Sequence, residues 1–201
     1  MFEFWLGFNI DYPIVYEKCK KSLNRYDIKT NKILLYVEDS TTNNFSRTRF
    51  LTPLLDSSAN KWVAFCDDDF LFLKNPKKLM SNLSDDKIVY LCKHDYVSNT
   101  DIKMNNKINN NYHCKNWSSL MIFNKDKFNL SMHQILNMNL MDLHQFKWIN
   151  NDDIGSIPLT WNWLVGEYEY NSDSSALHYT LGGPWYENYI KTDYDKIWLD
   201  F

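Results

Sequence analysis

Residues 62–72, Trp-Val-Ala-Phe-Cys-Asp-Asp-Asp-Phe-Leu-Phe, join an apolar run directly to three aspartates. The apolar residues 62–66 predict a buried central strand. Ligands of an open α/β sheet bind at the carboxyl ends of its strands, and the aspartates would lie at such an end. If the extended conformation persists, Asp67 and Asp69 point to the same side and could share one divalent cation.

A solvated turn is the other interpretation of these aspartates. Turns favour aspartate, but they usually also contain Gly, Pro, Asn or Ser, whereas both flanks here are bulky and apolar. Carboxylates this close to a core need something that neutralises their charge. An EF-hand is excluded, because its loop glycine and terminal glutamate are missing. The stretch therefore indicates a metal site that carries a phosphorylated ligand.

Length and composition limit the classes of protein that the chain can represent. Its 201 residues suffice for one domain with a substantial core, so we assign residues 1–201 to a single domain. The net charge of −3 argues against nucleic acid as a partner. No apolar run reaches the about 18 residues of a membrane span. The four cysteines lack C-x-x-C spacing, which favours a cytoplasmic protein, free or peripheral to a membrane.

Strand-like and helix-like runs alternate along the chain, which predicts α/β architecture. Strands are expected at 2–8, 33–37, 62–66, 88–92 and 120–123, and helices at 14–25, 45–56, 76–83 and 131–146. Residues 98–115 are rich in asparagine and poor in apolar residues, so we expect a mobile loop or an extended edge hairpin there. Residues 186–201 are the C-terminal tail.

Residues 177–185, Leu-His-Tyr-Thr-Leu-Gly-Gly-Pro-Trp, form a second informative segment. Leu177 and Tyr179 indicate a short strand that presents His178. The two glycines allow a sharp turn or a close approach of the backbone to a ligand. A lone histidine is more often structural, but beside a carboxylate pair an imidazole is a reasonable third ligand for Mn²⁺.

A hydrophobic strand with Asp-x-Asp and a late His-x-x-Gly segment ending in Pro-Trp resembles the GT-A glycosyltransferases of family eight. That group includes glycogenin and bacterial galactosyltransferases. The sequence is more closely similar to bacterial proteins known only as glycosyltransferases or sugar transferase-related proteins. The likeness rests on the aspartate strand and on the blocks 48–53, 93–96, 115–119, 152–162 and 178–185. It implies a single GT-A domain, Rossmann-like, with a mixed central sheet flanked by helices.

The resemblance also implies roles for the residues at matching positions. Mn²⁺ or Mg²⁺ would be bound by Asp67, Asp69 and His178. The residues that contact the nucleotide-diphosphate sugar, with UDP as the expected nucleotide, would be Arg49, Asp68, Asp95, Asn116, Gly182 and Gly183. Asp152 or Asp153 would lie beside the anomeric carbon as the catalytic carboxylate, although Asp153 could equally cap the turn before Ile154.

Two positions depart from the family pattern. Family-eight enzymes carry a lysine before the late Pro-Trp that neutralises the diphosphate, and Gly183 stands there. Backbone amides around Gly182 and Gly183 could form an anion nest instead, or Lys191 could reach the site. The first strand ends in Gly7-Phe8-Asn9, where the relatives tend to have aspartate, so the base and ribose contacts stay open.

The expected function is metal-dependent transfer of a sugar from a nucleotide-diphosphate donor to a glycan, lipid-linked or protein acceptor. Retention of the anomeric configuration is implied by the resemblance alone. Two other functions stay open. A nucleotidyltransferase shares the acidic metal ligands, but it usually has a Gly-rich basic loop near the first strand, and residues 5–15 contain no lysine or arginine. A non-catalytic protein could bind a nucleotide sugar or glycan through the same pocket.

Overall fold

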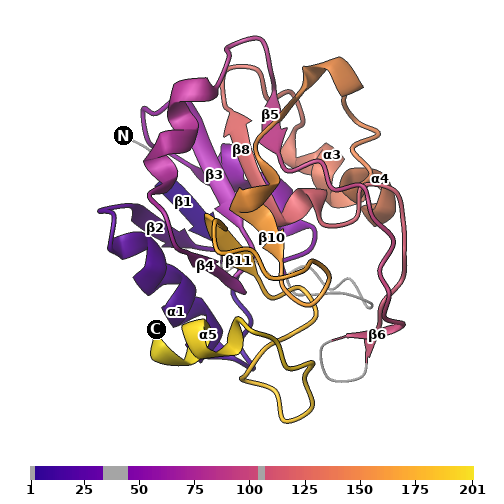
Figure 1. Ribbon diagram of the computed structural model, residues 1–201. Coiled ribbons are helices and arrows are strands. Elements are labelled where there is room, and N and C mark those ends of the chain that lie inside the picture. Colours follow the sequence, from indigo (N-terminus) through magenta and orange to yellow (C-terminus); the bar gives the residue numbers. More distant parts are fainter. Residues whose placement is uncertain (1–2, 34–44, 104–106) are drawn as a thin grey trace.

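The computed structural model describes residues 3–33, 45–103 and 107–201, and a six-stranded sheet lies at its centre (Figure 1). The strands are β1 Glu3–Leu6, β2 Lys29–Lys32, β3 Trp62–Cys66, β5 Val89–Leu91, β8 Leu120–Asn124 and β9 Ile154–Ser156. Their order is β2-β1-β3-β8-β5-β9. β8 is antiparallel to both of its neighbours and every other pair is parallel, so the mixed central sheet is confirmed.

A smaller sheet continues from the end of β3. It contains β10 Trp163–Leu164, β11 Ala176–His178 and β4 Phe70–Phe72, in that order. Only residues 67–69 separate β3 from β4, so the three aspartates link the two sheets at the carboxyl edge of the central one. The segment 98–115 contains a separate hairpin of β6 Ile102–Lys103 and β7 Lys107–Ile108. Whether that segment is mobile stays a prediction.

Helices cover both faces of the central sheet. Successive side chains of β3 point to opposite faces, and because all of them are apolar, each face needs a covering layer. Trp62 and Ala64 pack with Cys19 of α1 on one face, and Val63 packs with Phe50 on the other. The α-helices are α1 Pro13–Asn24, α2 Thr52–Leu55, α3 Met132–Asn137, α4 Leu140–His144 and α5 Asp195–Asp200. The 3-10 helices are η1 Thr48–Leu51, η2 Pro76–Asn82, η3 Trp117–Ser119, η4 Asn151–Asp153 and η5 Leu159–Asn162.

Most of the predicted elements are present, and the differences have local causes. The predicted helix at 45–56 is divided into η1 and α2, and Pro53, which lacks an N–H, lies in the first turn of α2. The predicted helix at 131–146 is divided into α3 and α4, because the Asn139 side chain caps a new helix by accepting from two backbone amides. The predicted strand at 33–37 lies almost wholly outside the described residues, and β2 precedes it.

None of the helices in the described parts of the chain has the length and apolar character needed to cross a bilayer.

Candidate functional site

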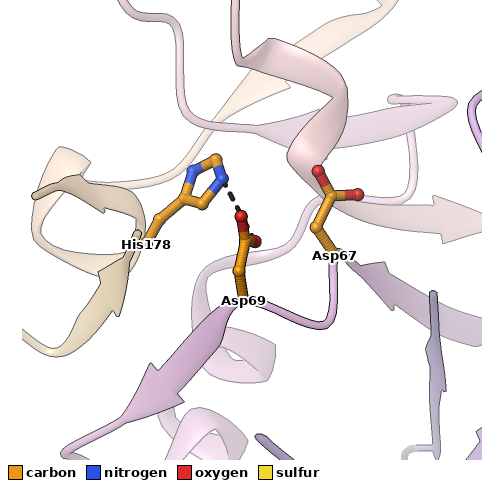
Figure 2. A group of neighbouring side chains, drawn as sticks. All are labelled: Asp67, Asp69 and His178. Carbon is orange, nitrogen blue, oxygen red and sulfur yellow. Dashed lines mark ion pairs between the residues drawn. The ribbon is translucent and has the colours of Figure 1, made fainter. Parts of the chain in front are cut away.

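Asp67, Asp69 and His178 come together at the junction of the two sheets (Figure 2). One ligand atom from each residue lies within 4.8 Å of the other two. Figure 2 shows Asp69 between Asp67 and His178, and His178 Nε2 is 3.4 Å from Asp69 Oδ1. The extended backbone ends at Cys66 and the aspartates form a turn, so our reason for expecting both carboxylates on one side was wrong. The turn nevertheless brings them together, and it is buried rather than solvated.

Backbone pairing fixes the positions of these residues. β11 is antiparallel to β4 with His178 opposite Phe70, which brings His178 beside the end of the aspartate turn. The Tyr179 N–H donates to the Asp69 carbonyl at 3.0 Å, and the Asp67 N–H donates to the Ser119 carbonyl at 2.9 Å. The first bond ties the turn to β11 and the second ties it to the chain just before β8. The geometry is therefore a property of the sheet register and not of a free loop.

The protein compensates the charges of this cluster only in part, through Arg49, which is ion-paired with Asp67. Asp67 is 8% exposed, Asp69 7% and His178 1%. Burial raises the pKa of Asp67 to about 6, against the opposing effect of Arg49, and burial also raises the pKa of Asp69 well above its usual value. Asp69 Oδ1 accepts no hydrogen bond from any described residue. Two buried carboxylates and a neutral imidazole suit a divalent cation, which would supply the missing positive charge.

Asn162 sets the tautomer of His178. Its Oδ1 lies 2.8 Å from His178 Nδ1, and its Nδ2 donates to Ser119 Oγ at 2.9 Å and to the Asn116 carbonyl at 3.2 Å. These donations orient the amide so that Oδ1 accepts from the Nδ1–H. The lone pair then lies on Nε2, which faces Asp69. Burial holds the pKa of His178 well below 6.5, so the imidazole is neutral and able to bind a metal.

Arg49 holds Asp67 from the other side. Its Nη1 is 3.0 Å from Asp67 Oδ1 and donates to the Ser118 carbonyl at 3.0 Å. The guanidinium carbon is 5.4 Å from the ring centroid of Phe45 and 5.1 Å from that of Phe65, distances typical of cation–π contacts. Arg49 is only 4% exposed. It therefore orients a carboxylate, and its predicted contact with the donor stays a prediction.

A pocket of about 400 Å³ opens over this cluster. Its wall includes Asp67, Asp69, His178, Arg49, Asn116 and Thr180, together with residues from the hairpin and from α4. The volume lies within the range of about 300–1,000 Å³ that small-molecule sites occupy. The pocket lies outside the carboxyl end of β3, where α/β sheets bind their ligands.

Asp68 faces a different, much smaller cavity. This cavity has about 20 Å³ and is bordered by Asn9, Asp68, Asp69, Trp185 and Tyr186 among others, so it holds little more than a water molecule. The Asn9 N–H donates to Asp68 Oδ2 at 2.7 Å, and burial raises the pKa of Asp68 to about 7. Asp68 thus lies at the carboxyl end of β1, beside the position that departs from the family pattern, and its predicted contact with the donor stays a prediction.

The remaining predicted donor residues differ in where they lie. Asn116, in a left-handed conformation with φ of 63°, lines the pocket, and its Oδ1 accepts from Thr180 Oγ1 at 3.2 Å. Gly182 also has a positive φ, 98°, and its N–H already donates to the Tyr179 carbonyl. A Cβ at Gly183 would lie 2.4 Å from the Trp185 ring, so Trp185 occupies the space that a side chain there would need. Asp95 is exposed and is not in the pocket wall.

The structure corrects the assignment of Asp152 and Asp153. They precede β9, which is parallel to β5 and therefore to β3. The Asp153 carbonyl accepts from the Ile88 N–H, and the Ile88 carbonyl accepts from the N–H of Asn124, which is paired with Trp62. Asp153 is therefore level with Trp62, at the start of β3. Asp67 lies five residues further along β3, or roughly 16 Å at the usual strand rise. Both aspartates thus lie at the amino edge of the sheet, too far away to stabilise charge in this pocket.

Several residues of the site were not singled out from the sequence. Asn162 was part of a matching block without an assigned role, and Lys103 was inside the Asn-rich segment. Tyr112 and His144 also line the pocket. The position of Asn162 beside the bulky Trp161, within a matching block, was a usable signal. An asparagine that is buried there needs hydrogen-bond partners, which makes it a candidate for a role in the site. For Lys103, Tyr112 and His144, the sequence contains no such signal, and only the folded structure shows that they lie at the same pocket as the aspartates and His178.

Comparison with known proteins identifies the fold. The chain aligns over its whole length with the glycosyltransferase GlyE of Streptococcus pneumoniae TIGR4, with a TM-score of 0.66, 12% identity and 60% of that chain covered. An active-site mutant of LgtC gives a TM-score of 0.61 with 11% identity, covering 100% of this chain and 94% of LgtC. Mouse xyloside xylosyltransferase 1 gives 0.55 with 8% identity, covering 91% and 99%.

The chain has the GT-A glycosyltransferase fold. The predicted fold class is thereby confirmed. At these identities the likeness shows the fold and not the activity. No protein-family model matches the chain. In sequence, the chain is 38% identical over 166 residues to Protein CDI of Arabidopsis thaliana, a stretch that is 78% of this chain and 63% of that protein. The chain thus spans less than two thirds of that relative.

Proposed function

We propose that this protein is a metal-dependent glycosyltransferase that moves a sugar from a nucleotide-diphosphate donor, with UDP as the expected nucleotide. The observation that carries the proposal is the buried Asp67, Asp69 and His178 cluster on the floor of the pocket. In a GT-A fold, this position is the carboxyl edge of the sheet, where ligands bind. The acceptor is a hydroxyl of a glycan, a lipid-linked sugar or a protein.

The residues present fit the metal that the proposal requires. Asp67, Asp69 and His178 would hold Mn²⁺ or Mg²⁺, and such a cation, when bound, compensates the negative charge of a departing diphosphate. The chain's own contribution is orientation. Asn162 keeps the Nε2 lone pair of His178 directed at the site, and Phe70 stacks on the imidazole with ring centroids 4.5 Å apart.

Asn116 and Thr180 supply polar groups at the pocket wall, where sugar hydroxyls need hydrogen-bond partners. The amide of Asn116 is itself held by the Tyr96 hydroxyl at 2.7 Å. Retention at the anomeric centre is the expected stereochemical outcome, and its support is the resemblance of the sequence motifs to the retaining family-eight enzymes.

Turnover of nucleotide sugars tests the proposal. The protein is incubated with MnCl2 and a panel of UDP-, GDP- and dTDP-sugars, and released nucleoside diphosphate is measured with and without EDTA. The expected result is release from one donor that EDTA abolishes. Asp69→Asn, which removes one ligand charge at constant volume, should abolish release without unfolding the protein. Release that EDTA leaves unchanged would refute metal dependence.

Two further measurements separate the alternatives. A non-catalytic binder would show a thermal shift with a nucleotide sugar and Mn²⁺ but no released nucleotide. A nucleotidyltransferase would release pyrophosphate from a nucleoside triphosphate and a sugar phosphate. For an active enzyme, ¹H NMR of the anomeric coupling in the first product formed would report retention or inversion.

A further inference from the structure

The hairpin β6–β7 contributes two cations to the pocket that were not part of any sequence motif. Lys103 and Lys107 both line the pocket, and they are paired directly opposite each other in the hairpin. Side chains of directly opposed residues extend from the same face of an antiparallel pair. The two lysines therefore extend from one face of the hairpin, and both border the pocket. In Figure 1, β6 lies at the lower right, well away from the central sheet, so the hairpin forms an outer wall of the pocket.

A buried polar network ties the base of this hairpin to the second sheet. Asn109, 4% exposed, donates from Nδ2 to Ser98 Oγ at 2.6 Å, and its Oδ1 accepts from Lys115 Nζ at 2.8 Å. Ser98 Oγ in turn donates to Glu167 Oε1 at 2.5 Å, just after β10. The Asn109 N–H also donates to the Asp101 carbonyl at 2.8 Å, which joins the residue after β7 to the residue before β6. Because buried hydrogen bonds of this kind define one arrangement, the position of Lys103 is built into the fold.

The cations of the pocket wall are not equally available to a ligand. Arg49 is already engaged by Asp67 and by the Ser118 carbonyl. The Lys103 side chain, in contrast, forms no hydrogen bond and no ion pair with the described part of the chain. Burial lowers the pKa of Lys103, while the charges of Asp69 and Asp67 act in the opposite direction. Lys103 thus lines the same pocket as Asp67 and Asp69 without a hydrogen bond or ion pair to either.

Charge balance indicates what this ammonium is for. Asp67 and Asp69 together carry about −2, whereas Arg49, which is ion-paired with Asp67, and one divalent cation together supply +3, an excess of only one positive charge. A diphosphate would then add two to three negative charges to a largely buried site, where uncompensated charge is costly. The Gly182 N–H, a possible anion donor, is used by the Tyr179 carbonyl. Lys103 is the half-buried cation of the wall that is left to meet this charge.

We propose that Lys103 binds an anionic oxygen of the donor's diphosphate. The inference rests on the proposed function and specifies which residue neutralises the leaving group. It assigns this role to the hairpin in the Asn-rich segment, and not to the glycine loop after β11 or to Lys191. Lys103 is a diphosphate-binding residue: it holds the departing diphosphate by charge and by N–H donation, with no bond made or broken to the lysine.

Equilibrium binding of the Mn²⁺ complexes of UDP and of inorganic pyrophosphate tests the proposal. Pyrophosphate lacks a base and a sugar, so it reports on the anion subsite whichever nucleotide is used. In Lys103→Met, the dissociation constants of both complexes should rise about 10- to 100-fold, the usual effect of losing one charge-assisted hydrogen bond. Lys103→Arg, which keeps the charge, should recover most of that loss.

Mn²⁺ alone should respond in the opposite direction. Lys103 repels a cation at the two carboxylates, so Lys103→Met should bind free Mn²⁺ as tightly as the wild type or more tightly. This sign distinguishes a diphosphate-binding lysine from one that only supports the fold, since a damaged fold weakens every ligand. Lys127→Met is the matched control, because Lys127 is exposed beyond the end of β8 at the opposite edge of the sheet, and it should change neither affinity.

Three results would overturn the assignment. The first is unchanged binding of both anions by Lys103→Met. The second is a loss confined to Lys107→Met. The third is an equal loss of free Mn²⁺ and of both anions. A wild-type protein that binds neither Mn²⁺ nor its UDP complex would refute the proposed function as well, which distinguishes that failure from a failure of Lys103 alone.

Discussion

Replacing Asn162 by alanine tests whether the metal cluster depends on its hydrogen-bonded support. Asn162 is fully buried and makes three hydrogen bonds, to His178 Nδ1, Ser119 Oγ and the Asn116 carbonyl. The variant leaves the Nδ1–H without its acceptor, so the imidazole can rotate or change tautomer. Loss of the group that orients a metal-binding histidine typically weakens metal binding by about 10- to 100-fold, equivalent to about 1.4–2.7 kcal/mol.

The variant also loses stability, and this loss needs its own control. Each buried polar group left without a partner lowers the free energy of unfolding by about 1–3 kcal/mol. Asn124 provides the match, because it is also fully buried and its side chain also makes three hydrogen bonds, to backbone groups of Asp85, Lys87 and Asp126. It lies at the far end of β8, away from the pocket. Asn124→Ala should therefore lose comparable stability and keep its metal affinity.

Calorimetric titration with MnCl2, alongside urea unfolding, measures both quantities on the same samples. The expected result is that the dissociation constant for Mn²⁺ rises at least tenfold in Asn162→Ala and stays within twofold of wild type in Asn124→Ala. If Asn162→Ala does not fold, Asn162→Asp replaces it, because the aspartate keeps an acceptor for Nδ1 and should keep the affinity while lowering stability. Equal Mn²⁺ affinity in the two alanine variants would refute the reasoning.

Three further predictions follow from the same geometry. Asp69→Ala should lower the Mn²⁺ affinity at least 100-fold and raise the unfolding temperature of the metal-free protein, because a buried carboxylate whose pKa is raised destabilises the fold above that pKa; a lower unfolding temperature would contradict this. The folded pKa of Asp67, about 6, is raised above its unfolded value, so its stabilising contribution is present below about pH 4 and lost as pH rises through 6. Mn²⁺ binds the ionised form, so the metal-induced thermal shift should increase from pH 5 to 7.5, and a flat profile would contradict the assignment. Gly183→Ala should cost about 1–3 kcal/mol in urea unfolding, since its Cβ would lie 2.4 Å from the Trp185 ring; an unchanged midpoint would show that the ring moves freely.

The sequence was most informative where a local pattern had a direct structural consequence. The run Trp62–Cys66 predicted β3 to the residue, because a short continuous apolar run is typical of a strand buried on both faces. The grouping of Asp67, Asp69 and His178 was also predicted, although the backbone at the aspartates turns. The turn could not be foreseen, because it depends on the pairing of β4 with β11 more than 100 residues later in the chain.

Sequence reasoning failed where long-range topology decides the outcome. Asp152 and Asp153 looked suited to catalysis by their chemistry, but β9 pairs with β5 so that both lie at the opposite edge of the sheet. Lys103 shows the reverse case. Its segment has the composition of a loop, and only the network around the buried Asn109 brings it to the pocket. Neither placement follows from any pattern in the neighbouring residues.

Asp67, Asp69 and His178 are proposed to bind a divalent cation that in turn binds a diphosphate. Crystals grown with MnCl2 and UDP, with anomalous diffraction recorded near the manganese edge, test this proposal most directly. The expected result is one strong anomalous peak about 2.0–2.4 Å from an oxygen of each aspartate and from His178 Nε2, with diphosphate oxygens completing the coordination of the metal. A manganese peak elsewhere, or UDP bound in the pocket without any peak at this cluster, would contradict it.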